Sequence, residues 1–183
     1  MPSISPERLS IVSPTAVVFD LDDTLYPERD YVFSGFRAVG AYMERTAGVD
    51  ARSVYDRLWN AFLHGVRGDT FNIVLTELGL KTDHELIAKL VRVYRTHTPT
   101  IAPYPDTIRV LNTIRPYTRL GLLTDGVAEG QRLKIKALGI DFWFDAIIFT
   151  DDLGRENWKP SVVPFLRLLG MLELDPAHAM YVG

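Results

Sequence analysis

Four short apolar runs recur along the chain, and each ends in polar residues or in glycine. They cover residues 16–19, 120–123, 146–149 and 179–182. Their length and their content of β-branched residues favour strands that are buried on both faces, as in a parallel sheet.

Amphipathic patterns between these runs predict helices over residues 105–114, 128–138 and 162–169. Pro105 suits a first helical turn, and Gly139 and Gly170 follow the second and third patterns as candidate helix ends. Strands that alternate with helices imply βαβ crossovers. The fold class expected is therefore α/β, a parallel sheet with helices on both faces.

One long stretch, from about Tyr31 to Thr98, predicts helices only. Their expected spans are 31–46, 51–64, 71–78 and 83–96. An all-helical block inserted after the first strand suggests a lid over the carboxyl end of that strand, which is where open α/β sheets bind their ligands.

Composition and charge exclude several other classes of protein. The 183 residues are 47% hydrophobic and 23% charged, which fits one globular domain or a core with a modest insertion. The net charge of -3, without a basic block, argues against a nucleic-acid binder. The absence of cysteine excludes disulfides, thiolate metal sites and a cysteine nucleophile.

The first 14 residues are polar, contain three prolines and lack the apolar core of a signal peptide. We expect them to form a flexible lead-in. Because no apolar run approaches the ~20 residues that span a bilayer, we expect a cytoplasmic protein without a membrane partner.

Two carboxylates follow the first predicted strand directly. In Asp20-Leu21-Asp22-Asp23-Thr24 the chain leaves an extended conformation, so Asp20 and Asp22 can point into the same space. Such a pair can divide its work, one carboxylate attacking as a nucleophile and the other giving and taking protons. Because close carboxylates repel each other, both would be ionised only beside a cation, and Mg²⁺ suits oxygen ligands. The same residues could instead cap a helix or build a turn, and this motif alone leaves both interpretations open.

Two further loops place polar groups at the same rim of the predicted sheet. Thr124, followed by Asp125-Gly126, ends the second strand, where a hydroxyl and backbone N–H groups can hold an anion; an Asp-Gly turn is the simpler alternative. Lys159 lies in the loop after the third strand, where an ammonium group could neutralise a phosphoryl group, although a lone lysine is usually solvated. Because all three loops follow carboxyl ends of parallel strands, their combination favours a catalytic site.

Asp20-x-Asp22-x-Thr24, Thr124 and Lys159 resemble the first three motifs of the haloacid dehalogenase-like (HAD) hydrolase superfamily, and the helical insert resembles its type-one cap. The resemblance runs from about residue 15 to residue 183. It implies a Rossmann-like core formed by residues 15–27 and 99–183, with a cap at 28–98.

The resemblance also implies a role for each matched residue. Asp20 would attack phosphorus to form an aspartyl-phosphate, and Asp22 would protonate the leaving oxygen and then activate the hydrolytic water. Mg²⁺ would be bound by the Asp20 carboxylate and the backbone carbonyl of Asp22. Thr124 would hold a phosphoryl oxygen with help from the N–H groups of Asp125 and Gly126, while Lys159 would fix Asp20 and offset the developing charge.

Asp22 favours a phosphatase over a dehalogenase, because the superfamily's dehalogenases lack an acid at this position and release halide without a proton. We therefore expect a Mg²⁺-dependent phosphatase whose partner is a small phosphorylated metabolite. The alternatives are a phosphomutase, which returns the phosphoryl group to its substrate, and an HAD domain that binds without turnover.

The superfamily's fourth motif, one or two acidic residues after the fourth strand, has no counterpart in Met180-Tyr181-Val182-Gly183. We expect the metal site to lack one anionic ligand, and we interpret the core as incomplete at its C-terminus. The strand at 179–182 would then form an exposed sheet edge through which the chain could associate with another.

For other polar residues a structural role is a simpler interpretation than a catalytic one. Asp151 and Asp152 are expected in a turn or a helix cap. Tyr26 and Arg29 could reach a substrate, but a place in the hinge or on a solvated face is the simpler interpretation.

Overall fold

A four-stranded parallel sheet, in the order β3-β2-β1-β4, forms the centre of the molecule. The computed structural model describes residues 15–183; the predicted lead-in, residues 1–14, lies outside the described residues. The strands are β1 (Ala16–Phe19), β2 (Arg119–Thr124), β3 (Ala146–Phe149) and β4 (Ala179–Val182). All four predicted strands are therefore confirmed, with β2 one residue longer at each end.

The register brings the carboxyl ends of the strands to one rim of the sheet. Phe19 at the end of β1 lies opposite Leu122 on β2 and Val182 on β4. The loops that leave β1, β2 and β3 consequently meet at this rim, as the sequence predicts.

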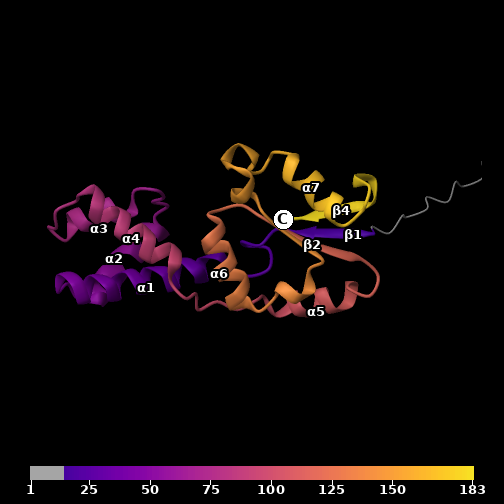
Figure 1. The fold of residues 1–183 in the computed structure, drawn as a ribbon. Coiled ribbons are helices and arrows are strands. Elements are labelled where there is room, and N and C mark those ends of the chain that lie inside the picture. Colours follow the sequence, from indigo (N-terminus) through magenta and orange to yellow (C-terminus); the bar gives the residue numbers. More distant parts are fainter. Residues whose placement is uncertain (1–14) are drawn as a thin grey trace, which may run out of the picture.

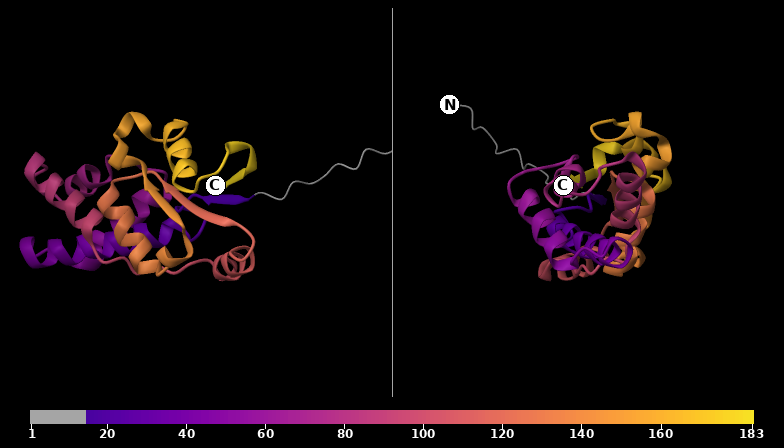
Figure 2. Two further views of the ribbon diagram at one scale, coloured as in Figure 1. Left: turned by 45° about the vertical axis from the view of Figure 1, so that its right-hand side comes forward. Right: turned by 90° about the vertical axis from the view of Figure 1, so that its left-hand side faces the viewer.

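Helices cover both faces of the sheet: α5 (Pro105–Ile114), α6 (Ala128–Leu138) and α7 (Val163–Met171). Alternate residues of β1 pack on opposite faces of the sheet. Val17 packs in one apolar cluster with α5 and α6, whereas Val18 packs in another with α7. Figures 1 and 2 show α7 on the opposite side of the sheet from α5. Short 3₁₀ turns complete this half of the molecule: η1 (Asp141–Trp143), η2 (Thr150–Leu153), η3 (Arg155–Asn157) and η4 (Pro176–His178).

Four helices are inserted between β1 and α5, and they lie together at one end of the molecule (Figure 1). They are α1 (Glu28–Ala47), α2 (Ala51–Leu63), α3 (Thr70–Glu77) and α4 (His84–Thr96). They have an apolar cluster of their own, built around buried residues such as Val39, Leu58 and Leu90. These four helices, named the cap from here on, are the all-helical insertion that the sequence predicts, and their action as a lid stays a prediction.

Two helix ends differ from the predictions by more than one residue. Helix α1 begins at Glu28 instead of Tyr31, because its first turn is polar and so precedes the apolar pattern; Pro27 lies at the N-cap. Helix α7 continues through Gly170 to Met171, so Gly170 is an interior residue and not a helix end.

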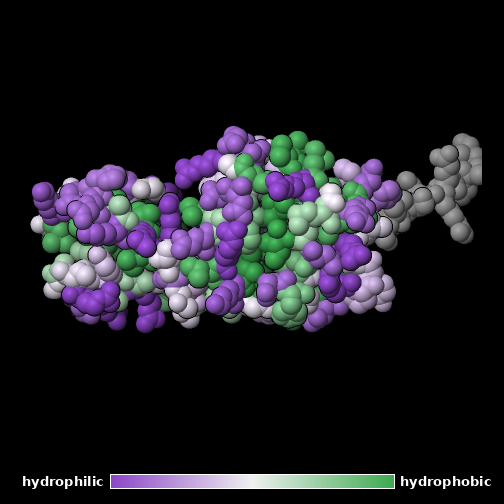
Figure 3. All heavy atoms as spheres, viewed as in Figure 1, coloured by the Kyte–Doolittle hydropathy of each residue, from purple (hydrophilic) through white to green (hydrophobic). Residues whose placement is uncertain are grey.

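Helix α7 and strand β4 carry several exposed apolar side chains, among them Leu166, Met171 and Met180. Apolar atoms are visible on this part of the surface in Figure 3. Strand β4 is an edge of the described sheet, as predicted. Across the described residues, 15–183, no helix is both long and apolar enough to cross a bilayer.

Candidate active site

The loop after β1 presents two aspartates at the rim of the sheet. Leu21, between them, is completely buried, and Leu25 is nearly so, and these two apolar side chains anchor the loop. The N–H of Asp20 donates to the carbonyl of Val182, which ties the start of the loop to β4. Asp20 and Asp22 are left partly exposed, with 21% and 23% of their side-chain surfaces accessible.

Lys159 reaches Asp20 from the loop after β3. Its Nζ lies 2.6 Å from Asp20 Oδ1 and 3.1 Å from the hydroxyl of Tyr181. Burial by itself would lower the pKa of Lys159, but the hydrogen bonds to Asp20 and Tyr181 raise this pKa above its ordinary value. Lys159 is therefore held as a cation beside Asp20.

Asp125 fixes the backbone of the loop that carries Lys159. Its carboxylate accepts the N–H of Lys159 at 3.1 Å and the hydroxyl of Thr150 at 2.7 Å. The loops after β2 and β3 are thus joined by the side chain of Asp125, while the predicted role of its N–H group in holding phosphate stays a prediction.

The carboxylate of Asp22 is surrounded by donors. Lys134 Nζ lies 2.7 Å from Oδ1 and 3.0 Å from Oδ2, and Gln131 Nε2 lies 2.9 Å from Oδ2. The hydroxyl of Tyr26 also donates to Oδ1. Burial and the neighbouring Asp22 raise the pKa of Tyr26 well above its ordinary value, so Tyr26 remains a neutral donor.

Thr124 joins the same network from the end of β2. Its side chain is completely buried, and its hydroxyl accepts a hydrogen bond from Gln131 Nε2 at 2.5 Å. Gln131 therefore bridges Thr124 and Asp22. The four predicted catalytic residues therefore form two hydrogen-bonded groups at one rim of the sheet: Asp20 with Lys159, and Asp22 with Thr124 through Gln131.

Sequence reasoning missed the residues that surround Asp22. Gln131 and Lys134 are three positions apart on α6 and share one face of this helix. Both are buried, at 3% and 5% exposure. The signal in the sequence that could have identified them is a pair of polar residues on the inward face of an amphipathic helix. Tyr26, for which the sequence favoured a place in the hinge or on a solvated face, is completely buried and contacts Asp22, so the solvated face is wrong.

Asp151 and Asp152 have structural contacts, as predicted. The carboxylate of Asp151 accepts the N–H of Ala128, the first residue of α6, at 3.0 Å, so it caps this helix from another loop. Asp152 forms an ion pair with Arg132 at 2.5 Å.

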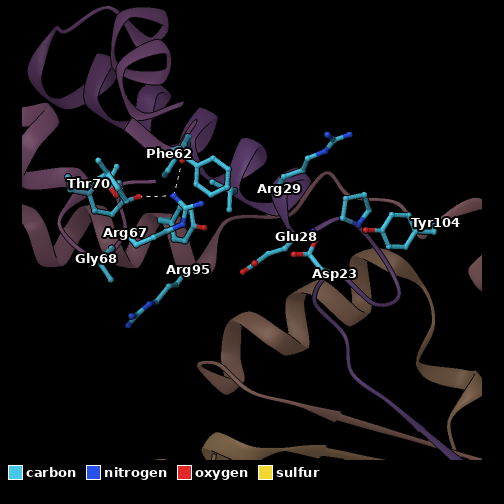
Figure 4. Close-up of a pocket in the computed structure, with 16 residues that line it drawn as sticks. Asp23, Glu28, Arg29, Phe62, Arg67, Gly68, Thr70, Arg95 and Tyr104 are labelled. Carbon is cyan, nitrogen blue, oxygen red and sulfur yellow. Dashed lines mark hydrogen bonds between the residues drawn. The ribbon is translucent and has the colours of Figure 1, made fainter. Parts of the chain in front are cut away.

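A cavity of about 690 Å³ opens between the cap and the loop after β1. Asp23 and Glu28 line it from the loop and the start of α1, whereas Arg67 and Arg95 line it from the cap. In Figure 4, Glu28 extends from the start of α1 toward the cap, whereas the guanidinium group of Arg95 lies on the side away from Asp23 and Glu28; both residues line the cavity. The guanidinium group of Arg67 is already engaged: it stacks on Phe62 and donates to the carbonyls of Phe62 and Val66.

The acidic residues at the rim fit a magnesium ion whose remaining ligands are mostly water molecules or substrate oxygens. Asp20 offers its carboxylate, and the main chain at Asp22 offers a carbonyl. The described part of the chain contains no cluster of three or more His, Asp or Glu side chains that could hold a metal alone. Magnesium is commonly bound by one or two carboxylates together with waters and substrate phosphate, so this small donor set fits it.

A family model described as haloacid dehalogenase-like hydrolase matches residues 14–183. A glyceraldehyde 3-phosphate phosphatase of Methanopyrus kandleri is 31% identical over 177 residues, which cover 92% of this chain and 74% of the relative.

Solved structures have the same fold. A HAD phosphatase from Thermococcus onnurineus is 29% identical, with a TM-score of 0.57, and the match covers 92% of this chain and 76% of that one. A putative beta-phosphoglucomutase from Thermotoga maritima, 22% identical, has a TM-score of 0.65 over 91% of this chain and 74% of that one.

Proposed function

The chain belongs to the haloacid dehalogenase-like hydrolases, and from this premise we propose that it is a magnesium-dependent phosphatase acting on a small phosphate monoester. The observation that carries the proposal is the pairing of Lys159 with Asp20 beside the donor-bound carboxylate of Asp22. The names of its relatives, which include glyceraldehyde 3-phosphate phosphatase, support the phosphatase assignment.

Asp20 acts as the nucleophile. Lys159 holds Oδ1, and among the described residues no donor engages Oδ2, so this second oxygen is available to attack phosphorus. A bond then forms between Asp20 and phosphorus while the bond from phosphorus to the leaving oxygen breaks. The ammonium group of Lys159 offsets the negative charge that develops during this transfer.

Asp22 moves the protons of both steps. As a carboxylic acid it gives a proton to the leaving oxygen, and the alcohol departs. As a carboxylate it then takes a proton from the water that attacks the aspartyl-phosphate, which releases inorganic phosphate and restores Asp20. A leaving alkoxide needs such a proton whereas a halide does not, so Asp22 favours phosphate esters over haloacids as substrates.

The remaining groups bind and orient. Thr124, Asp125 and Gly126 precede α6 in the chain. We assign the N–H groups of Asp125 and Gly126 and the hydroxyl of Thr124 to a phosphoryl oxygen of the substrate, because backbone donors at the amino end of a helix favour an anion. The Asp20 carboxylate and the Asp22 carbonyl would hold Mg²⁺. When bound, the ion neutralises charge on the phosphate group.

The test is the release of inorganic phosphate in the presence of Mg²⁺ from 4-nitrophenyl phosphate and from a panel of small phosphorylated metabolites that includes glyceraldehyde 3-phosphate. Asp20→Asn removes the nucleophilic oxygen with little change of shape and is expected to abolish turnover. The matched control is Asp141→Asn, because Asp141 is exposed and lies outside the site. Wild-type protein that releases no phosphate from any of these esters, or an Asp20→Asn variant as active as wild type, would contradict the proposal.

A further inference from the structure

Lys134 is a buried cation that the first three motifs do not account for. It lies in the second turn of α6, its residue is 5% exposed, and its Nζ contacts both carboxylate oxygens of Asp22. Removing an ammonium group from water costs several kcal/mol, and apolar residues of similar size often replace a buried ion pair without loss of stability. Folding stability therefore gives little reason for a lysine at this position, and its contact with Asp22 gives a better one.

The donors around Asp22 fix the direction of its carboxylate. Lys134 bridges the two oxygens, Tyr26 adds a second donor to Oδ1, and Gln131 adds a second donor to Oδ2. An ionised carboxylate can accept hydrogen bonds on both of its oxygens, and these donors engage both oxygens of Asp22. The rotation of the group about its last bond is consequently determined by α6 and by the loop that carries Tyr26.

Lys134 is itself held from the side of the cap. Its Nζ lies 4.3 Å from the centre of the Tyr31 ring, in the geometry of a cation–π contact. Tyr31 is the fourth residue of α1, and its hydroxyl donates to the carbonyls of Tyr94 and Arg95 at the end of α4. The ammonium group is therefore clamped between the carboxylate of Asp22 and the root of the cap.

We propose that Lys134 is a positioning residue that orients the carboxyl group of Asp22 for proton transfer. This inference rests on the proposed function, because it gives a role to Lys134 in the same reaction. Lys134 forms and breaks no covalent bond and keeps its own protons. The proton that reaches the leaving oxygen comes from Asp22, and Lys134 determines where that proton is presented.

The experiment measures kcat/KM for a series of aryl phosphates whose leaving phenols range from strongly acidic (2,4-dinitrophenyl phosphate) to weakly acidic (phenyl phosphate). This parameter covers the steps up to release of the phenol. A weakly acidic phenol depends on protonation by Asp22, whereas dinitrophenolate leaves unaided. Lys134→Met is expected to lower kcat/KM for phenyl phosphate by about 10²-fold, the usual scale of general acid catalysis, and to lower it for 2,4-dinitrophenyl phosphate only a few-fold.

Two variants serve as controls on the same helix. Lys134→Arg keeps a cationic donor and is expected to restore part of the activity toward phenyl phosphate. Lys136→Met removes a lysine that is exposed and two positions away, and it should match wild type across the whole series. A purely structural role of Lys134 would instead lower kcat/KM by a similar factor for every ester.

A double-mutant comparison tests whether Lys134 acts through Asp22. In an Asp22→Asn background the added Lys134→Met change is expected to alter kcat/KM by less than about twofold, because the group that Lys134 orients is gone. Lys134→Gln is measured beside Lys134→Met, so that a folding defect in one variant still leaves the other to decide. Wild-type activity with unchanged leaving-group dependence in the folded Lys134 variants would overturn this inference alone, whereas the absence of wild-type activity would overturn the proposed function with it.

Discussion

At the scale of single residues, the site depends on charges that the fold holds at fixed positions. Lys159 contacts Asp20 because Asp125 binds the backbone N–H of Lys159 and thereby holds its loop against the end of β2. Lys159 and Asp20 are 139 residues apart in the sequence, so only folding brings their opposite charges together. The same principle applies away from the site, at Asp145.

Asp145 joins two strands through a single carboxylate. Its Oδ2 accepts the N–H of Leu120 on β2 at 2.8 Å and a guanidinium hydrogen of Arg115 at 2.5 Å, and Arg119 lies 3.3 Å from Oδ1. Burial by itself would raise the pKa of Asp145, but these donors lower it below its ordinary value. The unfolded state then binds a proton at a higher pH than the folded state does, so this carboxylate stabilises the fold above its unfolded pKa of about 3.9.

We predict that Asp145→Asn lowers the free energy of unfolding by about 1–3 kcal/mol at pH 7, the usual scale for hydrogen bonds to a charged group. The difference from wild type should shrink as the pH falls below about 4, because protonation removes the same charge from the wild-type protein. Urea denaturation at pH 7, 5 and 3.5 measures this difference, with Asp141→Asn as the exposed control. A difference that stays constant down to pH 3.5 would contradict the prediction.

The residue scale also marks the limit of what the sequence can predict about the site. Asp20 and Asp22 were predictable because they directly follow an apolar strand, and Lys159 because it follows another strand at the same rim. Gln131 and Lys134 could not be assigned a role, because contacts of α6 with the loop after β1 depend on how the helix rotates and packs on the sheet. Polar residues on an inward helix face have no defined partner until the tertiary structure is known.

At the scale of elements, the apolar pattern predicted every strand and every α-helix of the described chain. The errors lie at helix ends, where interactions other than apolar burial determine the boundary. Helix α1 begins early because acidic residues in its first turn, Glu28 and Asp30, suit the amino end of a helix without being apolar. A glycine usually ends a helix when its backbone takes the left-handed conformation. The backbone at Gly170 stays helical instead, so α7 continues to Met171.

The close approach of α1 and α2 depends on a glycine. A Cβ atom at Gly40, in the middle of α1, would lie 2.5 Å from the backbone carbonyl oxygen of Ala51, where α2 begins. Backbone atoms of a helix start cannot shift as the end of a flexible side chain can. The packing of the cap therefore requires the absence of a side chain at this position.

We predict that Gly40→Ala destabilises the protein by about 1–3 kcal/mol, as overpacking usually does. The matched control is Gly170→Ala in α7, where a Cβ atom would meet nothing within 4 Å. This second change should stabilise by about 0.5–1 kcal/mol, because alanine loses less conformational freedom than glycine in a helix. Thermal unfolding of both variants compares the two signs, and a Gly40→Ala variant as stable as wild type would show that α1 and α2 are not packed this closely.

At the scale of the whole molecule, the cavity between cap and core is the feature that no single segment contains. Its walls come from the loop after β1, from the start of α1 and from helices α2 to α4. The sequence predicted a lid over this end of the sheet. It could not predict which cap side chains face the loop, because that depends on the angle between the two parts. The structure places Arg95 in the wall of the cavity, and its guanidinium group forms no ion pair with any described residue.

Arg95 is therefore suited to recognise a second negative charge on the substrate. We predict that Arg95→Met raises KM about tenfold for phosphate monoesters whose leaving group carries a carboxylate, such as phosphoglycolate, since the loss of one partly exposed charge pair is worth about 1 kcal/mol or slightly more. The KM for 4-nitrophenyl phosphate, which has no such charge, should change less than twofold. Arg92→Met, which removes an exposed arginine of α4 that does not line the cavity, should leave both values near wild type. Equal changes in KM for charged and uncharged leaving groups would show that Arg95 does not select the substrate, and would leave Arg29 and Arg67 as the other cations of the cavity wall to be tested in the same way.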